Sequence, residues 1–179
     1  MSPYTLRPAV ESDATAICEI YNQGIEDRLA TLESETRTPE ERRQWLAARG
    51  PRHPVVVAEE TQPDAISNRR AGLAVPTTVI AWGSLNPFNP REAYRHVADF
   101  SIYVERAYRG KGVGRQLLAH LIDLARALSY HKMVLSAFPF NGAGMALYER
   151  MGFRTVGIYR EQGLLDGRWV DTIVMEKLL

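Results

Sequence analysis

The sequence has 179 residues, enough for one domain with a buried core. Its 22 lysines and arginines against 21 aspartates and glutamates give a net charge of +1, without the basic excess of nucleic-acid-binding proteins. One cysteine excludes an internal disulfide, and no apolar run reaches the roughly 18 residues that span a bilayer. We therefore expect one cytoplasmic domain, residues 1–179, without nucleic-acid or membrane partners.

The first half of the chain is predicted to form three strands and two helices. Apolar residues at helical spacing mark the first helix, and the series Thr38-Pro39-Glu40-Glu41 is typical of the start of the second. The expected elements are a strand at 4–7, a helix from Ser12 or Asp13 to about Ile25, a helix from Pro39 to about Ala48, a strand at 54–59, a surface loop at 61–76, a strand at 77–85 and an irregular segment at 86–91.

The second half is predicted to alternate between strands and helices. Its clearest helix has one apolar stripe, and Asp166-Gly167 is a hairpin turn signal that should bring Trp169 into a packed hairpin. The expected elements are strands at 97–104, 132–138, 154–162 and 168–177, and helices at 113–128 and 142–151, the latter ended by Gly152. This order predicts an α+β fold with a mixed, mostly antiparallel sheet of about seven strands and about four helices.

A glycine-rich segment follows the strand at 97–104 and leads into the long helix. It reads Arg109-Gly110-Lys111-Gly112-Val113-Gly114-Arg115. Glycines let backbone N–H groups turn toward a ligand, and the start of a helix attracts anions. The segment therefore predicts a phosphate or pyrophosphate site, although a plain tight turn has the same composition. It lacks the Gly-Lys-Ser/Thr ending of a Walker A loop and the third glycine of the dinucleotide fingerprint.

Two blocks of sequence resemble the GNAT superfamily of N-acetyltransferases. Arg109-x-x-Gly112-x-Gly114 is similar to the first signature of that superfamily. Asn141, Ala146, Leu147-Tyr148 and Met151-Gly152-Phe153 are similar to the second. Further similarity, including His96 to Ser101 and Asp166 to Asp171, extends over nearly the whole chain and resembles the phosphinothricin and arsinothricin acetyltransferase branch. The resemblance implies acetyl-coenzyme A (acetyl-CoA) as co-substrate, a homodimer and a resistance function.

The resemblance also implies roles for individual residues. Asp99 would be the general base, directly or through a water molecule, and Tyr148 the general acid; otherwise these are a structural carboxylate and a buried tyrosine. Asn141 would contact the cofactor or only cap a helix. The remaining expected cofactor contacts are Ile102, Tyr103, Val104, Arg109, Gly110, Lys111, Gly112, Val113, Gly114 and Arg115. The expected substrate contacts are Arg91, Asp99, Phe100 and Ser101.

The implied substrate is a small amino acid acetylated on its α-amine, of the phosphinothricin, arsinothricin, methionine sulfone or sulfoximine type. Arg91 would supply the cation for an anionic side-chain group. Alternatives are a polyamine or aminoglycoside acetyltransferase, a protein N-terminal acetyltransferase, and a non-catalytic coenzyme A sensor. The four histidines lack metal-ligand spacing, so no metal is expected, and Cys18 is expected in the core.

Overall fold

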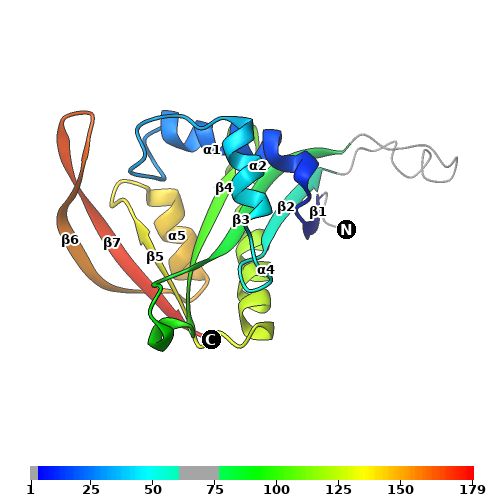
Figure 1. Cartoon of the computed structure of the whole chain (residues 1–179). Helices are drawn as coiled ribbons and strands as arrows, with labels where there is room; N and C mark the ends of the chain where they lie inside the picture. Colours follow the sequence, from blue (N-terminus) through cyan, green and yellow to red (C-terminus); the bar gives the residue numbers. More distant parts are fainter. Residues whose placement is uncertain (1–3, 61–76) are drawn as a thin grey trace, which may run out of the picture.

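A seven-stranded sheet organises the computed structural model, which describes residues 4–60 and 77–179 (Figure 1). The strand order is β1-β2-β3-β4-β5-β7-β6, and every neighbouring pair is antiparallel except β4 and β5. This confirms the predicted mixed sheet. The strands are β1 (Tyr4–Pro8), β2 (Val55–Glu60), β3 (Thr78–Pro87), β4 (Val97–Val104), β5 (Lys132–Ala137), β6 (Arg154–Leu165) and β7 (Arg168–Leu178).

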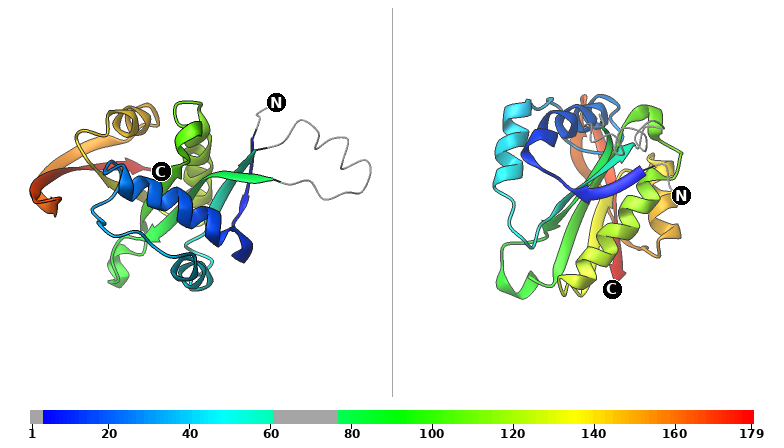
Figure 2. Two further views of the ribbon diagram at one scale, coloured as in Figure 1. Left: turned by 90° about the horizontal axis from the view of Figure 1, so that it is seen from above. Right: turned by 90° about the vertical axis from the view of Figure 1, so that its right-hand side faces the viewer.

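Helices cover both faces of the sheet (Figure 2). One face carries α1 and α2, and the other carries α4 and α5. The helices of the described residues are α1 (Ala14–Glu26), α2 (Pro39–Ala47), α4 (Val113–Ala127) and α5 (Gly142–Arg150). Thr38 caps α2 as predicted, because its hydroxyl accepts a hydrogen bond from the Glu41 N–H at 3.2 Å. No helix in these residues is long and apolar enough to cross a membrane.

The two faces have separate apolar cores, and β4 contributes to both. Phe100 and Ile102 join the core under α4, whereas Tyr103 packs with Trp82 in the core under α1. Successive strand residues point to opposite faces, so Asp99 and Ser101 share the α1–α2 face with Tyr103. Cys18 is buried, as expected.

One strand boundary differs from the prediction in a way that matters for the site. Residues 86–91 were expected to be irregular, but β3 continues to Pro87 and pairs Asn86 with Asp99. Pro87 is tolerated because it is the last residue of the strand, where a missing N–H costs least. The predicted loop at 61–76 lies outside the described residues.

The parallel pair β4–β5 opens after a short contact. Only Val97, Ala98 and Asp99 of β4 pair with β5, whereas β4 pairs with β3 up to Val104. The second half of β4 therefore has a hydrogen-bonded neighbour on one side and a gap on the other.

The β6–β7 hairpin forms the other end of the sheet and is largely exposed. It turns at Asp166 and Gly167, as predicted, and both residues have positive φ angles. Trp169 was expected to pack in this hairpin, but 62% of it is exposed. The reason is that β6 is the last strand of the sheet and no described helix packs on this end of the hairpin, which the α1–α2 connection touches at Asp166 and Gly163.

Candidate active site

The gap beside β4 exposes backbone hydrogen-bonding groups of Ile102 and Val104. The Glu105 N–H donates to the Ile80 carbonyl of β3 at 2.9 Å. Backbone groups alternate in direction along an antiparallel pair, so the N–H groups of Ile102 and Val104 point away from β3. They face the gap where β5 has diverged. Residues 102–104, which were expected to contact the cofactor, thus lie at an open edge of the sheet.

The glycine-rich segment brings further N–H groups to the same gap. Gly110 and Gly112 have φ angles of 76° and 87°, a left-handed conformation that strongly favours glycine. Gly112 is the N-cap of α4, so the first N–H groups of that helix have no partner within it. The start of α4 is therefore a site for anionic groups, as predicted.

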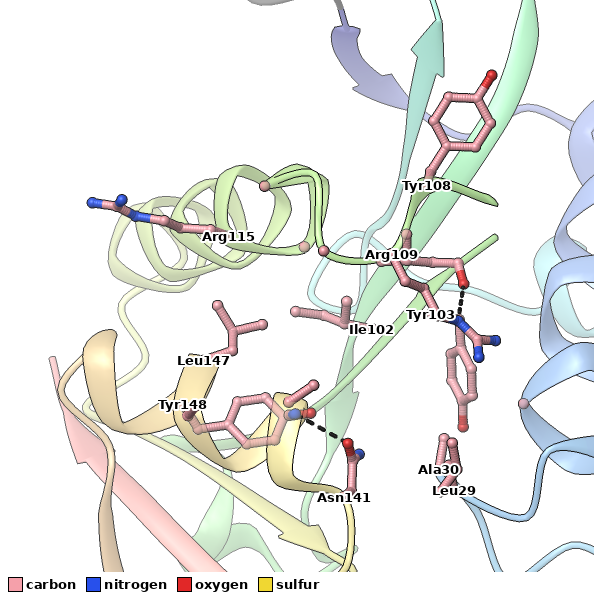
Figure 3. A pocket seen from close by; sticks show the side chains of 18 of the residues that line it. Leu29, Ala30, Ile102, Tyr103, Tyr108, Arg109, Arg115, Asn141, Leu147 and Tyr148 are labelled. Atoms are coloured by element: carbon pink, nitrogen blue, oxygen red, sulfur yellow. Dashed lines mark hydrogen bonds between the residues drawn. The ribbon is translucent and has the colours of Figure 1, made fainter. Parts of the chain in front are cut away.

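A cavity of about 660 Å³ extends from this helix start along the open edge of β4 (Figure 3). Most of the expected cofactor residues line it, namely Ile102, Tyr103, Val104, Arg109, Gly110, Gly112, Gly114, Arg115 and Asn141. Lys111 and Val113 do not. Val113 is buried in the core under α4, and the Lys111 ammonium lies 5.2 Å from the Tyr108 ring centre. The cavity is long and bordered by N–H groups and a cation, Arg115, which suits a phosphorylated ligand.

Arg109 is oriented differently from the prediction. Its guanidinium was expected to bind phosphate, but it pairs with the Asp27 carboxylate at 2.6 Å and donates to the Val104 carbonyl at 3.0 Å (Figure 3). These contacts tie the glycine-rich segment to α1 and to the end of β4. Arg109 therefore holds the loop in place in the structure. Its partner Asp27 lies 82 residues away, so no local pattern could reveal the pairing.

A second cavity of about 240 Å³ adjoins the first. Ile102, Tyr103, Asn141 and Tyr148 line both cavities, and Leu29 and Ala30 of the α1–α2 connection do so as well. Asp99, Phe100 and Ser101 line only the smaller one. The structure thus brings three of the four expected substrate contacts together, next to the larger cavity.

Asp99 has the properties of a base held in a protected site. Burial raises the pKa of its carboxyl group from 3.8 to about 6, and a hydrogen bond from Asn86 partly opposes this shift. The Asn86 Nδ2 lies 3.4 Å from Asp99 Oδ1 and 3.1 Å from the Ser101 hydroxyl. A carboxylate with a pKa near 6 is ionised at neutral pH and accepts protons more readily than an exposed aspartate.

Tyr148 stands where the two cavities meet. Burial, together with the nearby charge of Asp99, raises the pKa of its hydroxyl group to about 12. Its ring packs edge-on against Phe100, with centres 6.0 Å apart. The hydroxyl therefore stays protonated at neutral pH and is suited to donate a proton.

Asn86 contributes to the site but was not predicted. Its Oδ1 accepts hydrogen bonds from Arg49 and from the Ser84 hydroxyl, both at 2.9 Å. These contacts fix the amide so that its Nδ2 faces Asp99 and Ser101. The only sequence signal was its position late in a strand antiparallel to β4, which the two following prolines obscured.

Asn141 lines both cavities and also caps α5. Its Oδ1 accepts a hydrogen bond from the Gly144 N–H at 3.0 Å (Figure 3). Arg91, by contrast, is exposed in the segment between β3 and β4 and lines neither cavity. The structure therefore does not place Arg91 at the smaller cavity of its own chain. Among the described residues there is no cluster of histidine, cysteine and carboxylate side chains that could hold a metal ion.

Comparison with known proteins gives one family. Residues 17–153 match the model of the acetyltransferase (GNAT) family. The chain is 33% identical to an L-methionine sulfoximine/L-methionine sulfone acetyltransferase of Salmonella typhimurium over 175 residues, which cover 96% of this chain and 92% of that protein.

Two solved structures have the same fold. One is a GNAT superfamily phosphinothricin acetyltransferase of Sinorhizobium meliloti in complex with acetyl-CoA, with a TM-score of 0.85, 29% identity, and 99% and 89% of the two chains covered. The other is a ribosomal-protein-alanine N-acetyltransferase of Brucella melitensis, with a TM-score of 0.84, 34% identity, and 98% and 99% covered.

Proposed function

Because this chain belongs to the acetyltransferase (GNAT) family and is an acetyl-CoA-dependent N-acetyltransferase, we propose that it acetylates the α-amine of a small amino acid with a polar or anionic tetrahedral side-chain group. One observation carries the proposal: Asp99 and Tyr148 line a small cavity that opens directly onto the larger one. A base for an amine and a proton donor for a leaving group thus stand at one junction. Family membership removes the non-catalytic sensor from the alternatives.

The larger cavity is the proposed site for acetyl-CoA. The N–H groups at the start of α4, with Arg115, would bind the phosphates. The free N–H groups of Ile102 and Val104 would hold the pantetheine arm and polarise the thioester carbonyl, and Asn141 lines the same path. The cofactor supplies the acetyl group as a thioester.

Two residues of the chain would move protons. Asp99 accepts a proton from the substrate ammonium group, directly or through one water molecule, and so presents a neutral amine. The amine then forms the C–N bond to the acetyl carbon and the C–S bond breaks, while Tyr148 donates its hydroxyl proton to the departing sulfur atom. The second proton that the nitrogen loses restores the Tyr148 hydroxyl, directly or through water. No enzyme-bound covalent intermediate is required, because no activated nucleophile lines either cavity among the described residues. Much of the acceleration would come from holding both reactants at one junction.

The substrate class rests on the relatives and on the smaller cavity. The Salmonella relative acts on methionine sulfoximine and sulfone, and the Sinorhizobium protein is a phosphinothricin acetyltransferase. A cavity of about 240 Å³ suits one amino acid rather than a longer substrate. Arsinothricin shares the tetrahedral oxyanion of phosphinothricin and belongs to the same proposed class.

We expect a substrate panel to show this preference. Wild-type protein with acetyl-CoA should release free coenzyme A thiol rapidly with phosphinothricin, arsinothricin, methionine sulfone or sulfoximine, and slowly with spermidine, an aminoglycoside or a peptide N-terminus. Thiol detection, followed by mass analysis of the acetylated product, measures both rate and position. Efficient turnover of spermidine or a peptide with none of the four amino acids would refute the substrate class.

A protein N-terminal acetyltransferase is the second candidate function. It is favoured by the similarity to the ribosomal-protein-alanine N-acetyltransferase of Brucella melitensis. A peptide substrate needs a groove that continues past the amine, and such an enzyme should prefer an alanine peptide to free amino acids. The peptide arm of the same panel separates the two candidates.

We also propose that the protein is a homodimer. The β6–β7 hairpin exposes several large apolar side chains, and β6 is an edge strand with one side unpaired. The exposed residues are Val156, Ile158, Tyr159, Leu164 and Trp169. Light scattering at micromolar concentration should give twice the mass of the 179-residue chain, and Trp169→Lys should lower that mass. A monomeric wild-type protein would contradict the proposal.

A further inference from the structure

A third cavity, of about 390 Å³, lies on the α1–α2 face of the sheet, beside the substrate cavity. Ser101 and Tyr103 line both of these cavities. Asn86, which donates a hydrogen bond to Asp99, also lines the third one. The third cavity therefore begins one layer of side chains beyond the proposed base, where the far end of a bound amino acid would lie.

Arg42 of α2 lines this cavity and makes no direct ion pair with a described carboxylate. Only 8% of the residue is exposed, and its guanidinium carbon stacks 3.7 Å from the centre of the Tyr21 ring. Among the described residues, no carboxylate lies within 4 Å of this guanidinium, and its Nε has no hydrogen-bond partner. A buried donor without an acceptor is unfavourable, so the arrangement favours a ligand that brings an oxygen acceptor to the Arg42 Nε–H.

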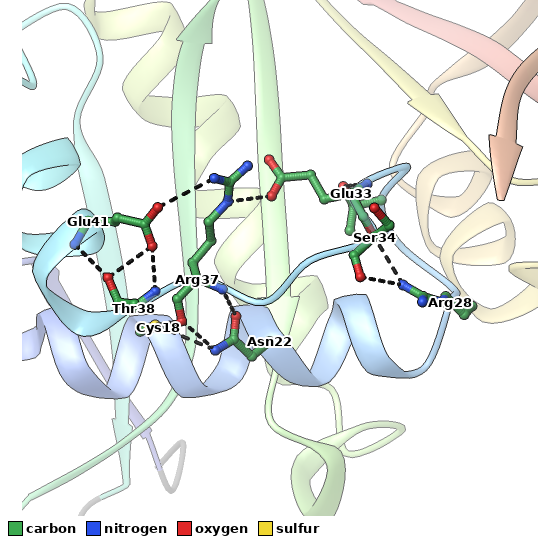
Figure 4. Close-up of polar contacts among 9 residues, drawn as sticks. Cys18, Asn22, Arg28, Glu33, Ser34, Arg37, Thr38 and Glu41 are labelled. Atoms are coloured by element: carbon green, nitrogen blue, oxygen red, sulfur yellow. Dashed lines mark hydrogen bonds and ion pairs between the residues drawn. The ribbon is translucent and has the colours of Figure 1, made fainter. Parts of the chain in front are cut away.

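Arg37, the other arginine at this cavity, is fully paired. Its guanidinium contacts Glu33 at 2.7 Å and Glu41 at 3.6 Å (Figure 4). Those two carboxylates also line the cavity, so the formal charges of its two arginines and two glutamates balance, but the direct ion pairs go to Arg37. Arg42 thus differs from Arg37 in having no direct ion pair, and its Nε–H remains available to a ligand.

A second donor without a partner lines the same cavity. Trp82 of β3 is 1% exposed, and its indole Nε1 has no hydrogen-bond partner in the described residues. A buried indole N–H normally has an acceptor. Two buried donors at one small cavity, one charged and one neutral, match an oxyanion that accepts several hydrogen bonds.

We infer that Arg42 and Trp82 bind the oxygen atoms of the tetrahedral group at the end of the substrate's side chain, an inference that rests on the proposed function. Asp99 does not line the third cavity, whereas Ser101 does, so the two donors lie beyond the amine site. The α-carboxylate is too close to the amine to reach them while the amine is at Asp99. Arg42 thereby takes the role that the sequence had suggested for Arg91.

The test compares an anionic with a neutral substrate. Arg42→Gln should lower kcat/KM for phosphinothricin roughly 10- to 100-fold, through KM, because a charge-assisted hydrogen bond is lost. For methionine sulfone, which carries no side-chain charge, the loss should stay below about fivefold. Arg43→Gln is the matched control, since Arg43 is the next residue of α2, points to solvent and pairs with Glu40. Arg43→Gln should leave kcat/KM unchanged for both substrates, and KM for acetyl-CoA should stay the same in both variants.

The remaining outcomes of the test can be told apart. Equal losses for both substrates would assign Arg42 to the α-carboxylate or to packing, and no loss would remove it from the site. If Arg42→Gln does not fold, Arg42→Lys decides: it keeps the charge but lacks the Nε–H, so a loss confined to phosphinothricin supports the inference and equal activity contradicts it. If wild-type protein acetylates neither amino acid, the proposed function itself fails.

Discussion

Asp99→Asn should lower kcat by roughly 100- to 10,000-fold, the usual contribution of a general base. The amide cannot accept the ammonium proton, yet it has nearly the same shape and can keep a hydrogen bond with Asn86. The pH dependence identifies the cause. In the wild-type protein kcat/KM should rise with one proton below pH about 6, where Asp99 is protonated, and stay level between that point and the pKa of the substrate amine. The variant should lose the lower break.

The matched control is Asp123→Asn, which removes an exposed carboxylate that pairs with Arg126 on α4. Its rate and pH profile should equal those of the wild-type protein. Should Asp99→Asn retain a break near pH 6, another group would be the base.

The same substitution should stabilise the protein at neutral pH. Asp99 has a folded-state pKa near 6 against 3.8 for an unperturbed group, so between these values the folded chain binds a proton that the unfolded chain has released. The free energy of unfolding therefore falls as the pH rises through that window, by at most about 3 kcal/mol. Asp99→Asn avoids this loss, and its melting temperature should exceed that of the wild type at pH 8 but not at pH 4.

Gly112→Val should weaken acetyl-CoA binding by roughly 100-fold or more, a free energy of about 2.7 kcal/mol. Gly112 has a φ angle of 87°, which a β-branched side chain adopts only with strain, and it is the N-cap whose conformation directs the first N–H groups of α4. A Cβ there meets no protein atom within 4 Å, so a side chain would extend into space next to the cavity rather than into the core. Titration calorimetry measures the change.

Gly167→Val separates strain from ligand contact. Gly167 also has a positive φ angle, 76°, and open space around its Cβ position, but it lies at the tip of the β6–β7 hairpin. This variant should keep the wild-type affinity for acetyl-CoA even where it lowers the melting temperature. Unchanged affinity in Gly112→Val would remove the helix start from the cofactor site.

Features encoded by neighbouring residues were predicted well. The bounds of β4, the start of α4 after the glycines and the turn at Asp166-Gly167 all follow from short-range rules on periodicity and positive φ angles.

Features that depend on distant partners were missed. The pairing of Arg109 with Asp27 cannot be read from either segment alone. Arg42 was not singled out, because its helix is mostly polar and gives no local sign that packing against Tyr21 buries it. Asn86 was hidden because two nearby prolines suggested an irregular segment, although strand pairing continues to Pro87.

Because β4 diverges from β5, a bound cofactor should also raise the free energy of unfolding of the protein. Among the described residues, strand pairing joins β1 to β4 with β5 to β7 through only three residue pairs. A cofactor bound along the gap would contact both parts of the sheet and hold them together. At a concentration of 100 times its Kd, it would add about 2.7 kcal/mol to the free energy of unfolding. Resistance to proteolysis, and with it the lifetime of the protein, would then rise and fall with the acetyl-CoA supply of the cell.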